Sequence, residues 1–294
     1  MSADEPGEDI VRVTPNPSLA QEWSVVLAAS GLAFRMEETD AGWALIVPTS
    51  DVAGAAGVLR AYDDENRAER PVAAEPLRYA ETWIGSVVAA ILVGFFAITG
   101  PWEPGVVWFE RGSASAEAIL SGEWWRTVTA LTLHHDLVHV LGNAVAGTLL
   151  ITAVGRSLGP GIACGLVLLA GAGGNALTAL VYGAHHVSAG ASTASFGAIG
   201  ILAGLQFVRR RRARSLEGKP WMAIAASLAL LGLMGTGPRS DLLAHLFGLL
   251  AGGALGVVAA LTVCRVPGPW IQWPLAVSVA AAVAGCWRLA FTWV

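Results

Sequence analysis

Two polar residues in separate apolar stretches of this 294-residue chain have the types needed for nucleophilic catalysis. Ser192 stands two residues after Gly190 at the start of one stretch, and His245 lies near the start of another, in DLLAHLFGLLAGG. A serine hydroxyl attacks a peptide carbonyl only when a neighbouring base accepts its proton, and histidine serves most often. A serine at a helix start is also a common cap or small packing residue, so this prediction depends on bringing His245 beside it.

His139 and Asn143 have the groups that such a reaction also needs. They are four residues apart, which places both side chains on one face of a helix. Attack on a carbonyl forms an oxyanion, which requires donors that are already in position. The two side chains could donate together with the backbone N–H of Ser192. The alternative is that they form hydrogen bonds between helices and only hold a bundle together.

The composition indicates that the elements carrying these residues belong in a membrane. Hydrophobic residues make up 54% of the chain, charged residues make up 14%, and the mean hydropathy of +0.58 is too high for a soluble domain of this size. Seven apolar stretches approach the roughly 20 residues that are needed to cross a bilayer. We expect these spans at residues 83–100, 137–154, 161–182, 189–208, 221–235, 242–263 and 271–289.

Glycines on the fourth and sixth spans predict how the serine and the histidine could meet. A face made of glycines lets the backbone of another helix approach closely. Ser192 and His245 lie at a similar depth, so contact along such faces would bring them within reach of each other. The glycines are Gly197, Gly200 and Gly204 on the fourth span, and Gly248, Gly252 and Gly256 on the sixth.

The basic residues predict the orientation of the chain. With the N-terminus in the cytoplasm, 14 of the 18 Lys and Arg residues fall on the inner side. All six histidines then fall on or near the outer side, and ionisable groups within spans usually mark a functional site. The connection at residues 101–136, which has four tryptophans, is too long for a simple connector and suits a segment that lies in the interface.

The chain divides into four predicted parts. Residues 1–70 have the strand-helix-strand-strand-helix pattern of a small α+β cytoplasmic domain, with Asp51 as the N-cap of its last helix. Residues 71–82 are a charged linker, residues 83–264 hold six spans, and residues 265–294 add a C-terminal transmembrane helix. The acidic N-terminus lacks the features of a signal peptide, so the first span would direct insertion. We therefore predict an all-α polytopic membrane protein with a small α+β domain attached.

Four separated motifs resemble those of the rhomboid family of intramembrane serine proteases, in the family's order and over the first six spans. The resemblance implies a rhomboid-like six-helix core, to which residues 265–294 would add a helix, as in family members with an appended one. The motifs are HVLGN with His139 and Asn143, GAST with Gly190 and Ser192, HLFGLLAG with His245 and Gly248, and the pair Trp125-Arg126 in the loop after the first span.

The resemblance also implies roles for individual residues. Ser192 and His245 would be the catalytic dyad, and His139 and Asn143 would form the oxyanion hole. The supporting residues would be Gly190, Gly248, Phe196, which would pack on the base, and Trp125 and Arg126, which would anchor the interfacial loop.

The implied activity is that of a serine endopeptidase that needs no cofactor and no metal. Its partners would be single-span or polytopic membrane-protein substrates and the lipid bilayer, with no nucleic acid. It would lie in a bacterial plasma membrane, with its N-terminus in the cytoplasm and its active site facing the outer side. Thr193 departs from the family's common GASG, and its β-branched side chain bears on efficiency and pocket shape.

Three other interpretations fit the sequence less well. A catalytically inactive rhomboid-like protein that binds membrane clients would keep the fold, and Thr193 is compatible with it. His135 and His139 have the spacing of a zinc helix, but Asp136 replaces the usual Glu and a third ligand is lacking, so His134 and His135 are expected to be solvated loop residues. A transporter would need a charged pair at mid-membrane or an internal repeat, and neither is visible.

Overall fold

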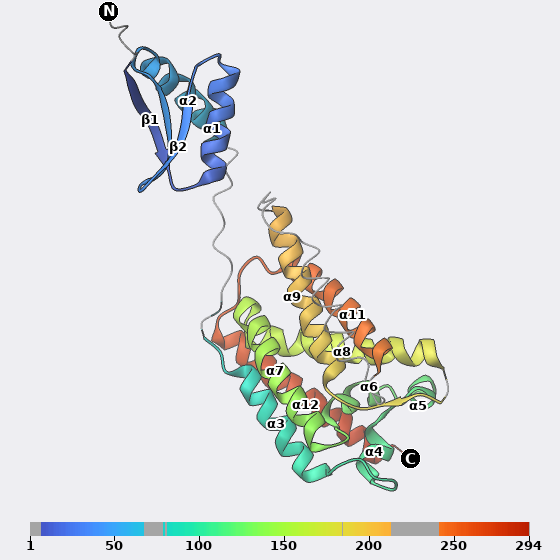
Figure 1. Cartoon of the computed structure of the whole chain (residues 1–294). Helices are drawn as coiled ribbons and strands as arrows, with labels where there is room; N and C mark the ends of the chain where they lie inside the picture. The colour runs from blue at the N-terminus through green and yellow to red at the C-terminus, as the bar shows by residue number, and fades with distance from the viewer. Residues whose placement is uncertain (1–6, 68–78, 80, 184, 213–240, 294) are drawn as a thin grey trace, which may run out of the picture. The chain divides into compact units, whose positions relative to one another are not determined.

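The computed structural model describes residues 7–67, 79, 81–183, 185–212 and 241–293, and it forms two compact units, Met1–Ala74 and Glu75–Val294 (Figure 1). The predicted fifth span, at residues 221–235, lies outside the described residues.

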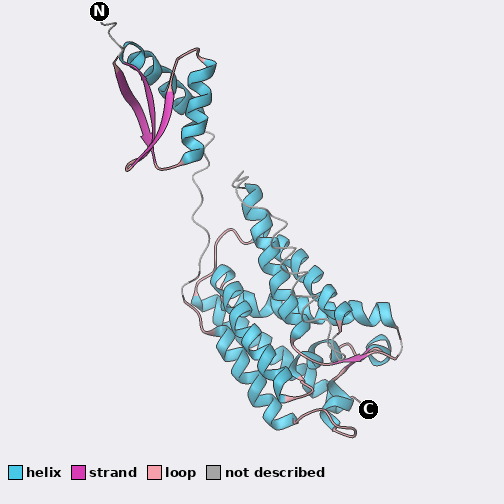
Figure 2. Cartoon of the chain, in the orientation of Figure 1, coloured by secondary structure: helices cyan, strands magenta, loops and turns pink. Residues whose placement is uncertain are grey.

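The first unit has the predicted α+β pattern. Its central strand, β3, pairs antiparallel with both of the other strands, which gives the sheet order β1-β3-β2 (Figure 2). Asp51 was predicted to cap the last helix, but it ends a 3-10 turn, η1, that leads directly into α2. The elements are β1 (Glu8–Thr14), α1 (Pro17–Ala29), β2 (Arg35–Thr39), β3 (Gly42–Pro48), η1 (Thr49–Asp51) and α2 (Val52–Arg67).

Both helices of this unit cover the same face of the sheet. Alternate residues of β3, Leu45 and Val47, are buried against Trp23 and Leu27 of α1 and Leu59 of α2. Alternation in a strand sends every second side chain to one face, so one side of β3 is enough to build this core.

The second unit is a bundle of helices, and six of the seven predicted spans fall on them. Among the described residues, α7, α8, α11 and α12 are long and apolar enough to cross a membrane. The helix α3 has 16 residues, and α9 ends in four arginines, so the predicted count of six core spans stays a prediction. The helices are α3 (Ile84–Thr99), α7 (Leu137–Leu158), α8 (Pro160–Tyr182), α9 (Ser192–Arg212), α11 (Leu242–Thr262) and α12 (Pro269–Thr292).

The helices α9 and α11 lie side by side in backbone contact (Figure 1). A Cβ atom added to Gly204 would lie 2.5 Å from the carbonyl oxygen of Gly253, and one added to Gly252 would overlap the carbonyl of Gly197. The predicted close approach of the two glycine faces is therefore present. It fixes the spacing of the helices that carry Ser192 and His245 with almost no intervening side chain.

The C-terminal helix α12, predicted as an addition to a six-helix core, is built into the second unit. Gln272 on α12 is fully buried, and its Oε1 accepts hydrogen bonds from the N–H groups of Gly161 (2.8 Å) and Ile162 (3.1 Å). Its Nε2 donates to the carbonyl of Leu158 (3.0 Å). One side chain thus satisfies the first N–H groups of α8 and the last turn of α7, which would otherwise lack intrahelical partners.

The long connection at residues 101–136 is folded. Its short strand β4 pairs antiparallel with β5 (Val187–Ser188), which precedes α9, so the connection is tied to the segment that leads to Ser192. Its elements are α4 (Val107–Gly112), β4 (Ala114–Ser115), α5 (Ala116–Leu120), α6 (Arg126–Thr129) and η2 (Ala130–Thr132).

Candidate active site

The structure brings Ser192 and His245 into direct contact. Ser192 is the first residue of α9 and His245 lies in the first turns of α11, and the distance between Ser192 Oγ and His245 Nε2 is 2.7 Å. His245 is buried, whereas Ser192 is half-buried. The ring of Phe196 stacks on the imidazole at a centroid distance of 4.6 Å and an angle of 24°. When Nε2 is the unprotonated nitrogen, it can take the serine proton.

Gly190 lets the ring of His139 approach the turn before the serine. Its φ angle is +142°, and a Cβ atom there would lie 2.8 Å from Cε1 and 2.9 Å from Nε2 of His139. The same added atom would be 3.7 Å from Ser192 Oγ, so the imidazole of His139 and the serine hydroxyl both lie next to this glycine. The Gly190 N–H donates to the carbonyl of Ala130 at 2.9 Å, which fastens the turn to η2.

Asn143 is buried one turn below His139 on α7. Its Nδ2 donates to the carbonyl of His139 at 3.1 Å, and a side-chain amide has a second N–H for another acceptor. Asp136 caps this helix, since its Oδ1 accepts from the N–H of His139 at 2.8 Å. These contacts fix the backbone that carries both predicted oxyanion donors.

The start of α9 provides a further donor. Ser192 is in the first turn of the helix, where backbone N–H groups have no intrahelical acceptor. Helix dipoles also make this end electropositive, which favours a negative charge beside it. A developing oxyanion near Ser192 would therefore meet N–H groups that have no intrahelical acceptor, in a favourable field.

Thr193 points its bulk away from the serine and into a gap between two other helices. It is 4% exposed, and its Cγ2 methyl would lie 2.6 Å from a Cβ atom added to Gly174 of α8 and 3.1 Å from one added to Gly248 of α11. The two glycines make the room that the β-branched side chain needs. Its effect on rate stays a prediction.

Arg126 and Trp125 are buried inside the folded connection. Arg126 Nε donates to Glu123 at 2.7 Å, and one of its terminal nitrogens donates to the carbonyls of Glu110 (2.9 Å) and Ser113 (3.2 Å). Trp125 is 1% exposed and packs in a cluster that includes Trp287 of α12. Both residues hold the connection together.

Sequence reasoning was wrong about His134, which is fully buried rather than solvated. The N–H of Ala191, the residue before the serine, donates to His134 Nε2 at 3.4 Å. Burial, together with the neighbouring His139 and His135, lowers the pKa of His134 to about 4. His134 is therefore a neutral acceptor at neutral pH. No residue pattern signals this, because the polar run before α7 has no apolar periodicity.

Sequence reasoning also missed a contact between His186 and Asp241. The distance between His186 Nε2 and Asp241 Oδ2 is 2.6 Å, and Asp241 Oδ1 caps α11 by accepting from the N–H of Ala244 at 3.0 Å. An acidic residue just before an apolar run is a helix-start signal, so the cap could have been found from the sequence. The histidine contact could not, since 55 residues separate the two.

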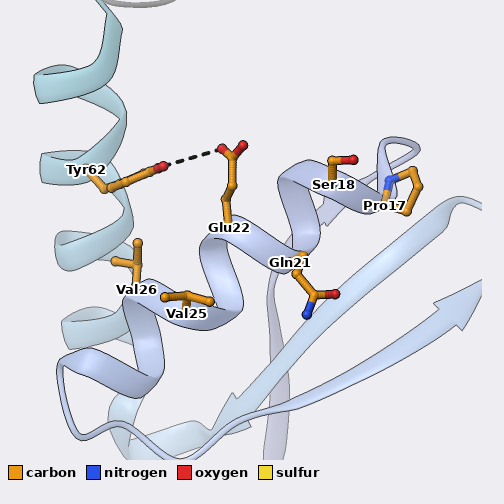
Figure 3. Close-up of a pocket in the computed structure, with 7 residues that line it drawn as sticks. All are labelled: Pro17, Ser18, Gln21, Glu22, Val25, Val26 and Tyr62. Atoms are coloured by element: carbon orange, nitrogen blue, oxygen red, sulfur yellow. Dashed lines mark hydrogen bonds between the residues drawn. The ribbon is translucent and has the colours of Figure 1, made fainter. Parts of the chain in front are cut away.

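Two other features do not provide a second site. Among the described residues, no group of three His, Cys, Asp or Glu side chains is arranged to hold a metal, and the rings of His135 and His139 stack at 5.6 Å. An open pocket on the first unit lies along α1 beside Tyr62 (Figure 3). Its charged lining residue is Glu22, which accepts a hydrogen bond from Tyr62 at 3.4 Å.

Comparisons with known proteins identify the family of this chain. Residues 121–262 match the Rhomboid domain family. The putative rhomboid protease YdcA of Bacillus subtilis is 30% identical over 165 residues, which cover 55% of this chain and 80% of the relative. The rhomboid protease GluP of Bacillus subtilis is 37% identical over 91 residues, 31% of this chain and 18% of the relative. The rhomboid-like protease 1 of Toxoplasma gondii is 28% identical over 168 residues, 56% of this chain and 57% of the relative.

Proposed function

This chain belongs to the rhomboid family, and we propose that it is an intramembrane serine endopeptidase with Ser192 as nucleophile and His245 as base. The observation that carries the proposal is the 2.7 Å contact between Ser192 Oγ and His245 Nε2. This distance lies within the range at which a base takes the proton of a nucleophile.

The proposed reaction has two halves. In the first, Ser192 Oγ bonds to the carbonyl carbon of the substrate as its proton passes to His245 Nε2. The protonated imidazole then gives that proton to the leaving amine, which breaks the peptide bond and leaves an acyl-enzyme. In the second, His245 takes a proton from water as the water oxygen bonds to the acyl carbon. The imidazole then returns the proton to Ser192 Oγ, and the carboxylic acid product leaves.

The oxyanion of each tetrahedral intermediate would be stabilised by the N–H of Ser192 at the start of α9, together with His139 and Asn143. Such donors act strongly because they are already in place and largely shielded from water. Gly190 and Phe196 would support the arrangement, the first by admitting the ring of His139 and the second by stacking on the base.

The substrates would be single-span or polytopic membrane proteins that reach this site within the bilayer. With the N-terminus in the cytoplasm, cleavage would occur near the outer face, because Ser192 and His245 begin their helices on that side. The proposed membrane is the bacterial plasma membrane.

Cleavage of a purified single-span reporter in proteoliposomes tests the proposal. Ser192→Ala and His245→Ala should each lower the rate by at least about 10³-fold, because the nucleophile and the base act as one unit. Ser195→Ala is the matched control, since this buried serine lies on the same helix outside the proposed site and should keep normal activity.

Unchanged cleavage by Ser192→Ala would refute the mechanism. If neither the wild type nor Ser192→Ala cleaves, and both retain the same membrane clients during purification, an inactive client-binding protein becomes the better interpretation. A fluorophosphonate probe, which labels activated serines, should label the wild type and Ser195→Ala but not Ser192→Ala.

A further inference from the structure

A buried carboxylate lies at the start of the helix that carries the proposed base. Asp241 uses its two oxygens for different partners, since Oδ1 caps α11 and Oδ2 contacts His186 Nε2 at 2.6 Å. The side chain of Asp241 is 11% exposed and that of His186 is 21% exposed. The position of this carboxylate is therefore set from two sides.

His186 is itself fixed by two further elements. Its ring stacks on Tyr182, the last residue of α8, at a centroid distance of 4.1 Å and an angle of 10°. Its carbonyl accepts a hydrogen bond from the N–H of Ala116 in α5 at 2.9 Å. The contact thus joins the start of α11 to α8 and to the folded connection.

Asp241 is one helical turn from His245. The N–H of His245 donates to the carbonyl of Asp241 at 3.1 Å, and Asp241 Oδ1 accepts from the N–H of Ala244, the residue next to the base, at 3.0 Å. Burial by itself would raise the pKa of Asp241, but the hydrogen bonds from His186 and the Ala244 N–H outweigh it and hold the pKa below its usual value. The carboxylate is therefore charged when the base works.

We infer that Asp241 is a positioning residue for His245, which sets the first turn of α11 and provides the negative charge that stabilises the imidazolium formed during attack. The inference rests on the proposed function. The proton leaves Ser192 Oγ for His245 Nε2 as the oxygen bonds to the carbonyl carbon, and Asp241 stays ionised throughout. His186 holds the carboxylate in place beside the base.

Substituting Asp241 by neutral residues that still cap α11 tests the role of its charge apart from its role as a cap. Asp241→Asn and Asp241→Ser are both good N-caps, so the N–H of Ala244 keeps an acceptor while the charge is lost. A unit charge one helical turn away, about 5.4 Å, is worth between a few-fold and about 100-fold in rate, depending on the local dielectric, so we expect a fall in kcat of about tenfold with KM unchanged. Glu117→Gln is the matched control, because this exposed residue follows Ala116 on α5 and its loss removes the same charge.

The pH profile distinguishes an electrostatic role from a purely structural one. Without the carboxylate the protonated form of His245 is less stable, so the acidic limb of the activity profile should move to lower pH by about one unit. Among the described residues, the other titratable groups around Asp241 and His245 are His186, Tyr182, Glu117 and His139, and the control variant reports the contribution of Glu117.

The experiment compares kcat, KM and the acidic limb for the wild type, both neutral Asp241 variants, Glu117→Gln and Ser192→Ala in proteoliposomes. A lower kcat together with the displaced limb supports the inference. The inference is wrong if both neutral variants match the wild type, or if kcat falls while the acidic limb stays at the same pH. In either case an inactive Ser192→Ala would still support the proposed function. Full cleavage by Ser192→Ala would overturn both.

Discussion

Replacing Gln272 by leucine should loosen the contact of α12 with α7 and α8. Leucine keeps most of the side-chain volume but removes the three hydrogen bonds that join α12 to α7 and α8, at the N–H groups of Gly161 and Ile162 and the carbonyl of Leu158, and a long one to the carbonyl of Pro267 at 3.5 Å. Each bond contributes about 0.6 to 1 kcal/mol in membrane and soluble proteins, so the free energy of unfolding should fall by about 2–3 kcal/mol. For a unit of this size, that corresponds to a drop in Tm of about 4–12 °C.

The measurement is thermal unfolding of the full chain in detergent, monitored by far-ultraviolet circular dichroism. The helical second unit dominates this signal. Gln206→Leu is the matched control, because it makes the same substitution at an exposed position of α9. This control should change stability by less than about 0.5 kcal/mol. If Gln272→Leu unfolds within about 1 °C of the control, the buried amide does not join α12 to the bundle in the way described above.

Two further predictions concern the segment around the serine. Gly190→Ala should lower the cleavage rate at least about tenfold, because a φ of +142° strains any side chain and the new Cβ would lie 2.8 Å from the ring of His139. The control Gly94→Ala, where the added Cβ would meet open space, should cleave normally. His134 should make stability depend on pH, since its pKa is about 4 when folded and about 6.5 when unfolded. This contribution is complete above about pH 6.5 and declines by about 3 kcal/mol as the pH falls towards 4, so Tm should fall less over that range in His134→Asn. An equal fall in the variant and the wild type would contradict this.

The elements of the fold and the main contact of the site were predictable from the sequence. Runs of apolar residues predict helices because a bilayer offers no partner for an unpaired backbone, and six of the seven predicted spans fall on described helices. The meeting of Ser192 and His245 was predictable because glycine faces on both spans permit close approach. Both inferences use local patterns that repeat along one helix.

The contacts that escaped prediction lack such a pattern. His134 precedes α7 in a polar run, and only the tertiary packing shows that it is buried under Ala191. Gln272 is a polar residue in a mostly apolar helix, and its partners on α7 and α8 lie 110 residues or more away. His186 and Asp241 face each other because the segment before α9 and the start of α11 meet in the tertiary fold, which local spacing does not encode.

The backbone contact between α9 and α11 has a consequence for how the site responds to its surroundings. Side chains can change rotamer when lipid composition, temperature or lateral pressure changes, but two touching backbones have no rotamers to exchange. The separation of Ser192 from His245 should therefore be nearly the same in thin and thick bilayers, and in the resting and the occupied protein. Any rearrangement that admits a substrate has to occur in elements other than this pair.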